Sequence, residues 1–479
     1  MDPILIILIG IAVVLFCIIV LRLHAVISLL FAALVTGFLT SPDLIYNFGI
    51  HQGMSDQQAL SLSQQGIGTR LTQAFGNTSG RIGILIALAS VIGTCLMRSG
   101  AAERIIRGLL KLFGTKNSSF AFLTGSFTLA IPVFFDTVFY LMIPLVKSIS
   151  IRNTKKFSLY LMTIIAGGVM AHSLIPPTPG PLFVAKEMGI DLGAMILGGL
   201  VIGSITALSG YFYALWANKK WDLPMRETPD ISLDELKTYS EKDSKELPGL
   251  FISFLPILLP VLLITGNTIL NMIVGGKETE ITSYEEVWLK TFSVIGDSNI
   301  ALAISSIIAL SLLWSRIKDI DKFKKYIYEA IVSAGIIVLI TSAGGAFGKM
   351  LQQTGIGIRI EELSSNYHMA ILPLAFIITA VVRTAQGSAT VAMVTAIGVM
   401  SGVSGADGGY PFHPVYLAMV IGCGSKIFPW MNDSAFWIIT KMSGMEEKET
   451  IRFFSFLLTV MGISGLIAIM ILSSLFPFV

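Results

Sequence analysis

Long apolar stretches constrain what this chain can fold into more than any other feature of its sequence. A stretch of about 20 residues matches a bilayer's hydrocarbon core, because a helix rises about 1.5 Å per residue and the core is roughly 30 Å thick. The stretches cover residues 3–21, 25–39, 82–97, 195–217, 250–264, 331–343 and 453–475. In lipid each helix satisfies its own backbone hydrogen bonds, whereas a β-barrel would show short alternating segments. With 54% hydrophobic and 13% charged residues, the sequence predicts an all-α polytopic membrane protein.

Basic residues cluster in a few loops, and these loops orient the predicted helices. Loops on the cytoplasmic side of a membrane are enriched in Lys and Arg. The basic loops are 98–116, 147–156, 219–226, 316–325 and 441–452. Alternation of sides then predicts ten crossings of the plasma (inner) membrane, with both termini non-cytoplasmic and residues 41–80 outside. The crossings are expected near 3–21, 24–40, 81–97, 157–191, 194–216, 249–273, 297–314, 327–348, 413–440 and 453–476.

Two further apolar segments do not fit as simple crossings. Basic clusters flank residues 118–146 on both ends, so a single span would leave one cluster on the wrong side. Residues 367–401 instead have weakly charged outer loops on both sides. Each segment is predicted to be a re-entrant hairpin, with its break at Ile131-Pro132 in the first and at 383–387 in the second. The alternative, that each forms one or two ordinary helices, stays open.

The order of these elements repeats along the chain. Gly100 and Gly355 each follow an apolar helix and precede a hairpin, and Pro176 and Pro429 each interrupt the helix after it. The counterparts are about 253–255 residues apart, which indicates a long internal duplication. On the predicted topology the two copies have opposite orientations, so the repeats are inverted.

This duplication divides the chain into predicted units. They are scaffold helices at 1–80 and 249–314, transport repeats at 81–216 and 327–479, and a cytoplasmic linker with a short surface helix at 217–248. Inverted repeats with broken helices can expose one central site to alternate sides, and half-helix ends can bind a polar substrate there. The arrangement favours a secondary transporter, with an ion channel as a rival because broken helices also build pores.

Other classes of function lack the residues that they need. A membrane hydrolase would require a nucleophile with its base, or a metal motif such as His-Glu-x-x-His, whereas the five histidines are scattered. The three cysteines lie in apolar stretches without a Cys-x-x-Cys spacing. The net charge of +3 comes from basic loops and does not indicate nucleic acid. We therefore expect no enzyme activity, no metal, no cofactor and no nucleic-acid partner.

Four motifs make a family resemblance recognisable. They are IPVFFD at 131–136, PPTPGP at 176–181, RTAQGSATVA at 383–392 and NDSAFW at 432–437. In this order, within a region from about Gly93 to the C-terminus, they resemble the gluconate permease (GntP) family. The resemblance implies a proton-coupled importer of a sugar acid or of a related small hydroxy or amino acid, including D-serine. Together with the repeats it suggests elevator-like movement of the hairpin bundles against the scaffold of a homodimer in the lipid bilayer.

The chain departs from the family pattern within these motifs. Thr178 stands where the family commonly has His, Leu182 where it has Thr, and Asp136 where it often has Glu. Pro429-Trp430 precedes the last motif, where a His-containing sequence is more usual. The expected substrate is a small anion resembling gluconate. A transporter of D-serine or another small amino or hydroxy acid is the alternative, and an ion channel is a more distant one.

The expected binding residues lie at the helix breaks. An Arg within the membrane is costly and its planar fork suits a carboxylate, so Arg383 is expected to bind the substrate's carboxylate or to line its route. Its alternative role is a structural pair with a buried acid, Asp136 or Asp433. Small polar residues would bind the substrate's hydroxyls or, alternatively, close backbone groups that the breaks leave open. These residues are Thr178, Gln386, Ser388, Thr390, Asn432 and Ser434.

Ionisable side chains within the membrane are candidates for carrying the coupling proton. Asp136 and Asp433 are the first two, unless one is a permanently ionised partner of Arg383. His172 is the third, because His titrates near neutrality, although it could instead be a structural hydrogen-bonding residue. Lys426, just before the second proline break, is interpreted as extending its charge toward the membrane surface.

Overall fold

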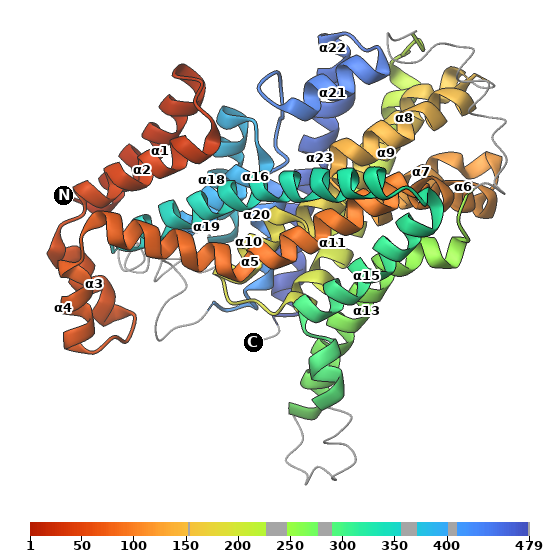
Figure 1. The fold of residues 1–479 in the computed structure, drawn as a ribbon. Coiled ribbons are helices and arrows are strands. Elements are labelled where there is room, and N and C mark those ends of the chain that lie inside the picture. Colours follow the sequence, from red (N-terminus) through yellow and green to blue (C-terminus); the bar gives the residue numbers. More distant parts are fainter. Residues whose placement is uncertain (152–153, 227–246, 276–289, 356–370, 401–409, 478–479) are drawn as a thin grey trace.

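The computed structural model describes residues 1–479 except 152–153, 227–246, 276–289, 356–370, 401–409 and 478–479. The regular elements of the described residues are all helices (Figure 1). Seven helical segments are long and apolar enough to cross a membrane, and α2 (Ala25–Leu39) with α3 (Pro42–His51), bent by 98°, could form an eighth. The predicted all-α polytopic class is therefore confirmed, whereas the count of ten crossings stays a prediction.

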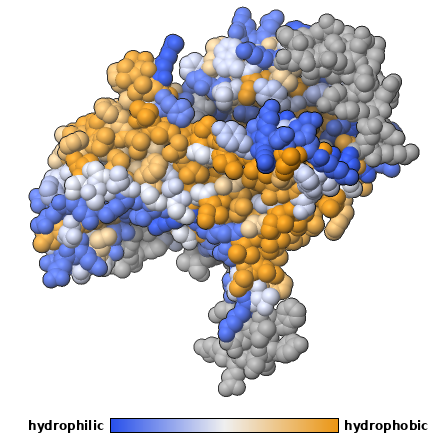
Figure 2. All heavy atoms as spheres, in the orientation of Figure 1, coloured by the Kyte–Doolittle hydropathy of each residue, from blue (hydrophilic) through white to orange (hydrophobic). Residues whose placement is uncertain are grey.

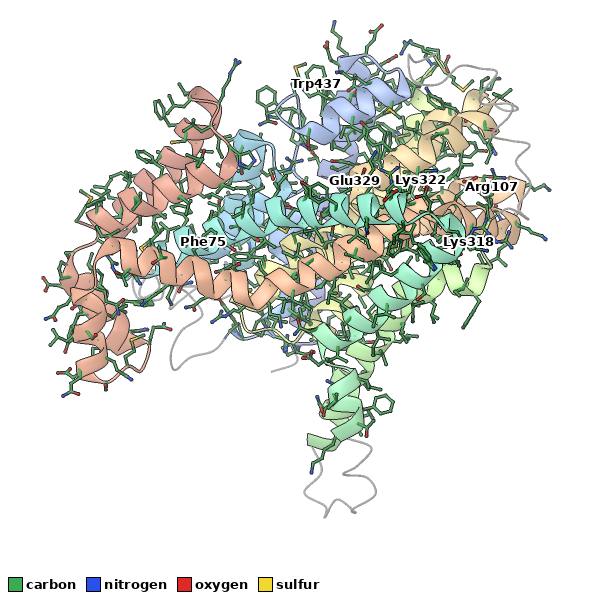
Figure 3. All side chains as sticks on the ribbon, viewed as in Figure 1. Phe75, Arg107, Lys318, Lys322, Glu329 and Trp437 are labelled. Atoms are coloured by element: carbon green, nitrogen blue, oxygen red, sulfur yellow. The ribbon has the colours of Figure 1, made fainter. Side chains whose placement is uncertain are left out.

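The N-terminal helices share an apolar cluster with side chains from residues 343–351 and 391–399. Helix α1 (Pro3–Leu15) continues as a π-helical turn at Phe16–Val20 and packs on α2. Helix α4 (Asp56–Gln64) follows α3, and α5 runs over Ile67–Arg98. The prediction started α5 too late, at residue 81. Its earlier turns are helical because Leu71 and Phe75, four residues apart on one face, pack against the N-terminal cluster (Figure 3).

Helices α5 and α16 (Ile320–Gln352) lie side by side in antiparallel orientation (Figure 1). At one end the Arg70 guanidinium donates to the Gln353 side-chain oxygen over 2.5 Å, and at the other Arg98 pairs with Glu329 over 2.9 Å. Helices α13 (Leu250–Gly275) and α15 (Ser298–Ile317) pack on each other, and α15 also packs on α5. Long helices from both halves of the chain therefore share one layer.

Two of the basic clusters that were predicted to be cytoplasmic lie at the same end of this layer. Figure 3 shows Arg107 of α6 (Ala101–Phe113) at the same end of the molecule as Lys318 and Lys322, which flank the start of α16. The Arg98 guanidinium, in turn, lies 4.6 Å from the ring centre of Tyr326. The shared end agrees with the prediction that both clusters face one side of a membrane.

Apolar side chains cover much of the outer surface. Figure 2 shows them over α1 and α2, across the middle of the molecule and over α13 and α15, with hydrophilic side chains gathered over α3 and α4. Phe38 and Phe251 are 73% and 80% exposed. A water-soluble monomer rarely exposes such extended apolar areas, whereas a helix facing lipid does.

The first broken unit follows α6. A turn at 130–134 separates α7 (Ser118–Leu129) from α8 (Phe135–Ser150), and an irregular segment at 175–178 separates α9 (Phe157–Leu174) from α10 (Pro179–Glu187). The breaks at Ile131-Pro132 and at Pro176-Pro177 are therefore where the prolines predicted them. Helix α9 is buried on nearly all sides, so the residues at its end lie deep in the molecule.

The second broken unit has the same order of elements. Helix α18 (Ile371–Gln386) is separated from α19 (Ala389–Met400) by Gly387 and Ser388. Residues 425–433 separate α20 (Val415–Gly424) from α21 (Ser434–Ser443), so the break around Pro429 is confirmed. Helix α11 (Leu192–Lys220) follows α10. The chain ends with α22 (Glu447–Thr450), a π-helical turn at Ile451–Ser455 and α23 (Phe456–Leu475). The ends of the hairpin predicted at 367–401 and the surface helix predicted in the linker lie outside the described residues.

Candidate functional site

A cavity of about 340 Å³ lies where the turn before α8 faces the α18–α19 break and the segment before α21. Helices α9 and α23 complete its wall. Its volume falls in the range of small-molecule sites, roughly 300–1,000 Å³. Nine of the ten predicted site residues line this cavity, and they are Asp136, His172, Arg383, Gln386, Ser388, Thr390, Asn432, Asp433 and Ser434.

Arg383 and Asp433 form a buried ion pair in the cavity wall. Their side chains are 3% and 8% exposed, and the guanidinium bonds directly to one carboxylate oxygen. The same guanidinium donates to the carbonyl oxygen of Gly387, while the other oxygen of Asp433 accepts from the Ala435 N–H over 2.8 Å. Of the two acids considered as partners of Arg383, the structure thus selects Asp433. A buried pair of this kind is strongly destabilised when one member is removed.

The α18–α19 break is held against the segment before α21. Gly387 has a φ of +86°, and a Cβ at this position would lie 2.2 Å from the carbonyl oxygen of Asn432. The Asn432 amide donates to the carbonyl oxygens of Thr384 and Ala385 over 2.9 and 3.1 Å, and the Trp430 indole donates to Thr384 over 2.7 Å. These bonds satisfy carbonyl groups that the end of α18 leaves without helical partners.

Three helices begin at the cavity. The first residues of α8, α19 and α21 are Phe135, Ala389 and Ser434, and all three line it. The N-terminus of a helix carries a partial positive charge and free N–H groups, which favour an anion. Ser388 already accepts from the Val391 N–H over 3.4 Å and so caps α19. The convergence of these helix starts makes the cavity electrically suited to a negatively charged ligand.

Several buried polar atoms around the cavity have no hydrogen-bond partner among the described residues. They are Nδ1 of His172, Oε1 of Gln386 and Nε of Arg383. Buried polar atoms in proteins are almost always paired. They belong to side chains that line the cavity, so its wall contains buried polar groups whose hydrogen bonds are incomplete in this conformation.

Lys426 is a cavity residue that the sequence reasoning missed. Its side chain is 4% exposed and lines the cavity, so the interpretation that it extends toward the membrane surface is wrong. Within the described part of the chain, its ammonium group has no ion pair or hydrogen bond. The signal was present: a lysine in an apolar stretch beside a helix break is costly in a membrane and marks a functional position.

Thr178 is the one predicted site residue that lies outside the cavity. It lines a small neighbouring void of about 10 Å³, to which Phe134 also contributes. The Thr178 hydroxyl donates to the carbonyl oxygen of Ile175 over 2.5 Å. It therefore closes a backbone group at the α9–α10 break, which was its predicted alternative role.

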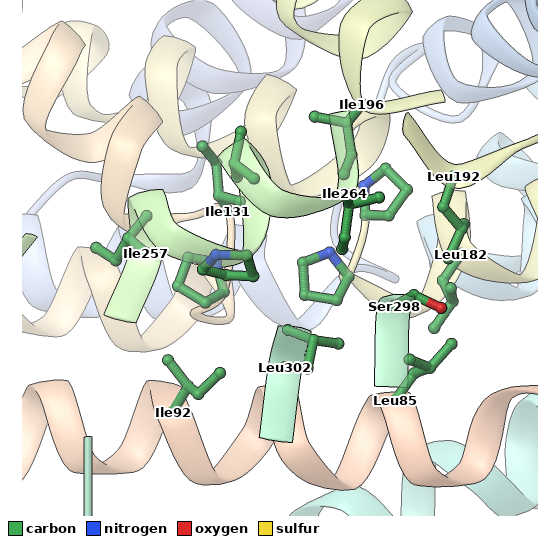
Figure 4. A pocket seen from close by; sticks show the side chains of 15 residues that line it. Leu85, Ile92, Ile131, Leu182, Leu192, Ile196, Ile257, Ile264, Ser298 and Leu302 are labelled. Atoms are coloured by element: carbon green, nitrogen blue, oxygen red, sulfur yellow. The ribbon is translucent and has the colours of Figure 1, made fainter. Parts of the chain in front are cut away.

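Two other cavities adjoin the broken helices. One, of about 20 Å³, lies between α5, α13, α15 and the first unit's breaks, and its lining is apolar apart from Ser298 (Figure 4). The other, of about 360 Å³, has the polar residues Ser90, Thr94 and Arg98 on one wall and Thr137 and Glu329 elsewhere. Phe134 lines both this polar cavity and the central one. No group of three metal-ligating side chains occurs in the portion that the structure describes.

Comparison with known proteins places this arrangement among transporters. A family model described as GntP family permease matches residues 2–475. An uncharacterized permease of Haemophilus influenzae is 33% identical over 93% of this chain and 86% of its own length. The gluconate permease of Bacillus subtilis is 30% identical over 98% and 99% of the two chains. The high-affinity gluconate transporter of Escherichia coli is 28% identical, again over 98% and 99%.

The fold also resembles a solved membrane protein. The structure of the YdaH transporter of Alcanivorax borkumensis superposes with a TM-score of 0.60 over 95% of this chain and 99% of that one, at 11% identity. At that identity the likeness concerns the fold alone. These relatives are permeases and transporters rather than enzymes, in agreement with the sequence prediction.

Proposed function

Because this chain belongs to the GntP permease family, we propose that it imports a small hydroxylated carboxylate, a gluconate-like sugar acid, together with protons and by alternating access. It is a multi-pass membrane protein of a transporter family, and we place it in the plasma (inner) membrane with both termini outside the cytoplasm. The observation that carries the proposal is the central cavity, where three helix starts and two buried cations surround a space of about 340 Å³.

The chemistry of the cavity supports a hydroxylated anion as substrate. Helix starts and cations favour the carboxylate, and the polar side chains of the lining suit hydroxyl groups. Ser388, Thr390, Asn432 and Ser434 provide further short polar side chains along the same wall. Thr178 lies in the adjoining void with its hydroxyl bonded to the Ile175 carbonyl, so we assign it to the support of the α9–α10 break.

Proton coupling is assigned to the acids and the histidine of the cavity. Asp433 is already engaged by Arg383 and by the start of α21. Asp136 lines the same cavity and makes no hydrogen bond or ion pair within the described residues. His172 has an open Nδ1. Of the three candidates, Asp136 and His172 are therefore the two whose protonation can change without breaking a hydrogen bond or ion pair among the described residues.

Alternating access would follow from the repeated order of elements. Each half has a long helix, a broken pair and an interrupted helix, at 81–216 and 327–479, and we propose that these are inverted repeats that move together as an elevator. Residues 1–80 and 249–314 would form the scaffold of a homodimer. The mainly apolar void between α15 and the first unit's breaks supports this division, because apolar surfaces can slide past each other (Figure 4). Two hydrogen bonds, Thr268 to Asp191 and Ser306 to the Leu88 carbonyl, would have to break during such a movement.

Transport into reconstituted vesicles tests the proposal. With an imposed inward proton gradient, purified protein should accumulate radiolabelled gluconate above its external concentration, and a protonophore should abolish the accumulation. Related sugar acids, glycerate and D-serine, assayed in the same way, rank the substrates. Accumulation of D-serine alone would establish the amino-acid alternative.

Two results would contradict the proposal. Flux that equilibrates gluconate but never concentrates it would indicate a channel. No uptake of any acid of the panel, by protein that unfolds cooperatively and is correctly inserted, would remove the assigned substrate class.

A further inference from the structure

The central cavity contains two buried cations, and among the described residues only Arg383 forms an ion pair. Arg383 is neutralised by Asp433 and also bonds Gly387, so its charge holds the cavity wall together. Lys426 lies in the segment just after α20, lines the same cavity, and has no ion pair or hydrogen bond within the described residues. A buried ammonium without a hydrogen-bonded counter-ion is costly, and a ligand carboxylate offsets that cost.

We propose that Lys426 binds the substrate's carboxylate, and that Asp136 takes up a proton when it does so. This inference rests on the proposed function and specifies which residue recognises the anion. Arg383 then lines the site as a positioning residue, because its guanidinium is already engaged by Asp433 and by the Gly387 carbonyl. The same arrangement explains why transport of the anion requires a proton.

The charges of the cavity support the second half of the proposal. Its ionisable groups are Arg383 and Lys426, Asp136 and Asp433, and His172, with the buried Cys423 thiol behind Lys426. Lys426 lies within electrostatic reach of both acids and of Arg383. With both acids ionised and His172 neutral, the charges sum to zero, and an added carboxylate would leave a buried net negative charge. A proton on one acid restores neutrality once the substrate is bound.

Asp136 is the acid that can take this proton. Protonating Asp433 would leave Arg383 unpaired and weaken the cap of α21, whereas Asp136 has no such contact to lose. Protonating His172 would instead add a third positive charge beside two others, next to the Phe134 ring whose centre lies 5.7 Å away. The loaded state therefore contains one proton and one carboxylate, which predicts a stoichiometry of one to one.

A neutral substrate analogue isolates the role of Lys426. Binding of gluconate and of gluconamide, in which an amide replaces the carboxylate, is measured by titration calorimetry on the purified full chain. Wild-type protein should prefer gluconate by about tenfold or more, as expected for a charge-assisted bond. Lys426→Gln should lose this preference while still binding gluconamide, which also shows that the variant is folded. Lys441→Gln, an exposed lysine outside the cavity, should keep the preference of the wild type.

Proton uptake isolates the role of Asp136. Titrations of gluconate in buffers of different ionisation enthalpy should give about one proton taken up per gluconate at neutral pH. Asp136→Asn should bind gluconate with no proton uptake. A Lys426→Gln protein that retains the full gluconate preference, or an Asp136→Asn protein that still takes up a proton, would overturn the inference. Wild-type protein that binds none of the sugar acids would instead refute the proposed function on which it rests.

Discussion

Arg383 and Asp433 each form the ion pair of the cavity wall and a hydrogen bond to a backbone group. Besides neutralising each other, Arg383 holds the Gly387 carbonyl and Asp433 holds the Ala435 N–H. The pair therefore links the α18–α19 break to the start of α21. Loss of either member would leave a buried charge without its partner and free one backbone group, so the pair is a structural part of the site as well as part of its lining.

A double-mutant cycle measures this pair. Arg383→Met and Asp433→Asn should each lower the free energy of unfolding by about 3–5 kcal/mol, because each leaves one buried charge or its partner groups unsatisfied. The double variant should lose clearly less than the sum of the two. Denaturant unfolding of the detergent-solubilised protein provides the values, and strictly additive losses would show that the two residues are not coupled.

Gly387 is a position where a side chain has no space. Gly387→Ala should lower stability by at least about 1–3 kcal/mol, because alanine disfavours positive φ and its Cβ would collide with the Asn432 carbonyl. Gly76→Ala is the matched control: Gly76 lies in α5 with no neighbour near its Cβ position. A Gly387→Ala protein as stable as the Gly76→Ala protein would show that the break tolerates a side chain.

The sequence located most of the site but could not assign its contacts. Arg383, Gln386 and Asn432 were expected because polar residues at helix breaks are costly in a membrane. The choice of Asp433 over Asp136 as the partner of Arg383 needed the fold, because it joins residues 50 positions apart. Lys426 was missed because its spacing from a helix end also fits a snorkelling side chain.

At the scale of the elements, the sequence predicted where helices are interrupted by proline but not where α5 begins. The breaks after α7, α9 and α20 were predictable because proline cannot continue a helix. The early start of α5 was not, because residues 67–80 are only weakly apolar and become helical through contacts of Leu71 and Phe75 with distant helices. The sequence pattern therefore predicts breaks within helices better than it predicts the residue at which a helix starts.

The start of α16 has a pH-sensitive cap. Asp319 accepts from the N–H groups of Lys322 and Asp321 over 3.1 and 3.0 Å, and these bonds hold the pKa of its carboxyl below the ordinary value. A lowered carboxyl pKa contributes stability that is complete above the unfolded-state value, about 4, and is lost as pH falls through the folded-state value. The midpoint of thermal unfolding should therefore be higher for wild type than for Asp319→Asn at pH 7, and this difference should shrink toward pH 3. A difference that is constant with pH would show that the Asp319 charge does not stabilise the helix.

At the scale of the whole molecule, the two halves of the chain interlock around two polar cavities. The central one holds the candidate site, and the other lies between α5, α16 and the turn before α8. Phe134 lines both. Hydropathy and motifs predicted the class of fold and the closeness of the turn at 130–134 to the break at 387–388. They could not predict the second cavity, because its walls come from residues such as Ser90 and Glu329, which belong to no motif.

Removal of the Phe134 ring should connect the two cavities. Phe134→Ala is expected to increase downhill gluconate efflux and to lower the steady-state accumulation by about tenfold, since an open path dissipates the gradient. Phe120→Ala, which removes a ring of α7 that packs on Phe113 away from both cavities, should leave accumulation unchanged. Equal accumulation by both variants would contradict a barrier at Phe134.

The bond between Arg70 and Gln353 has a consequence for how the protein is made. Arg70 is buried, and its partner lies 283 residues later in the chain. At a synthesis rate of about 5–20 residues per second, the ribosome needs roughly 15–60 s to deliver that partner. For that interval the nascent first half carries an arginine whose partner has not been made, so this end of the contact between α5 and α16 can close only late in synthesis.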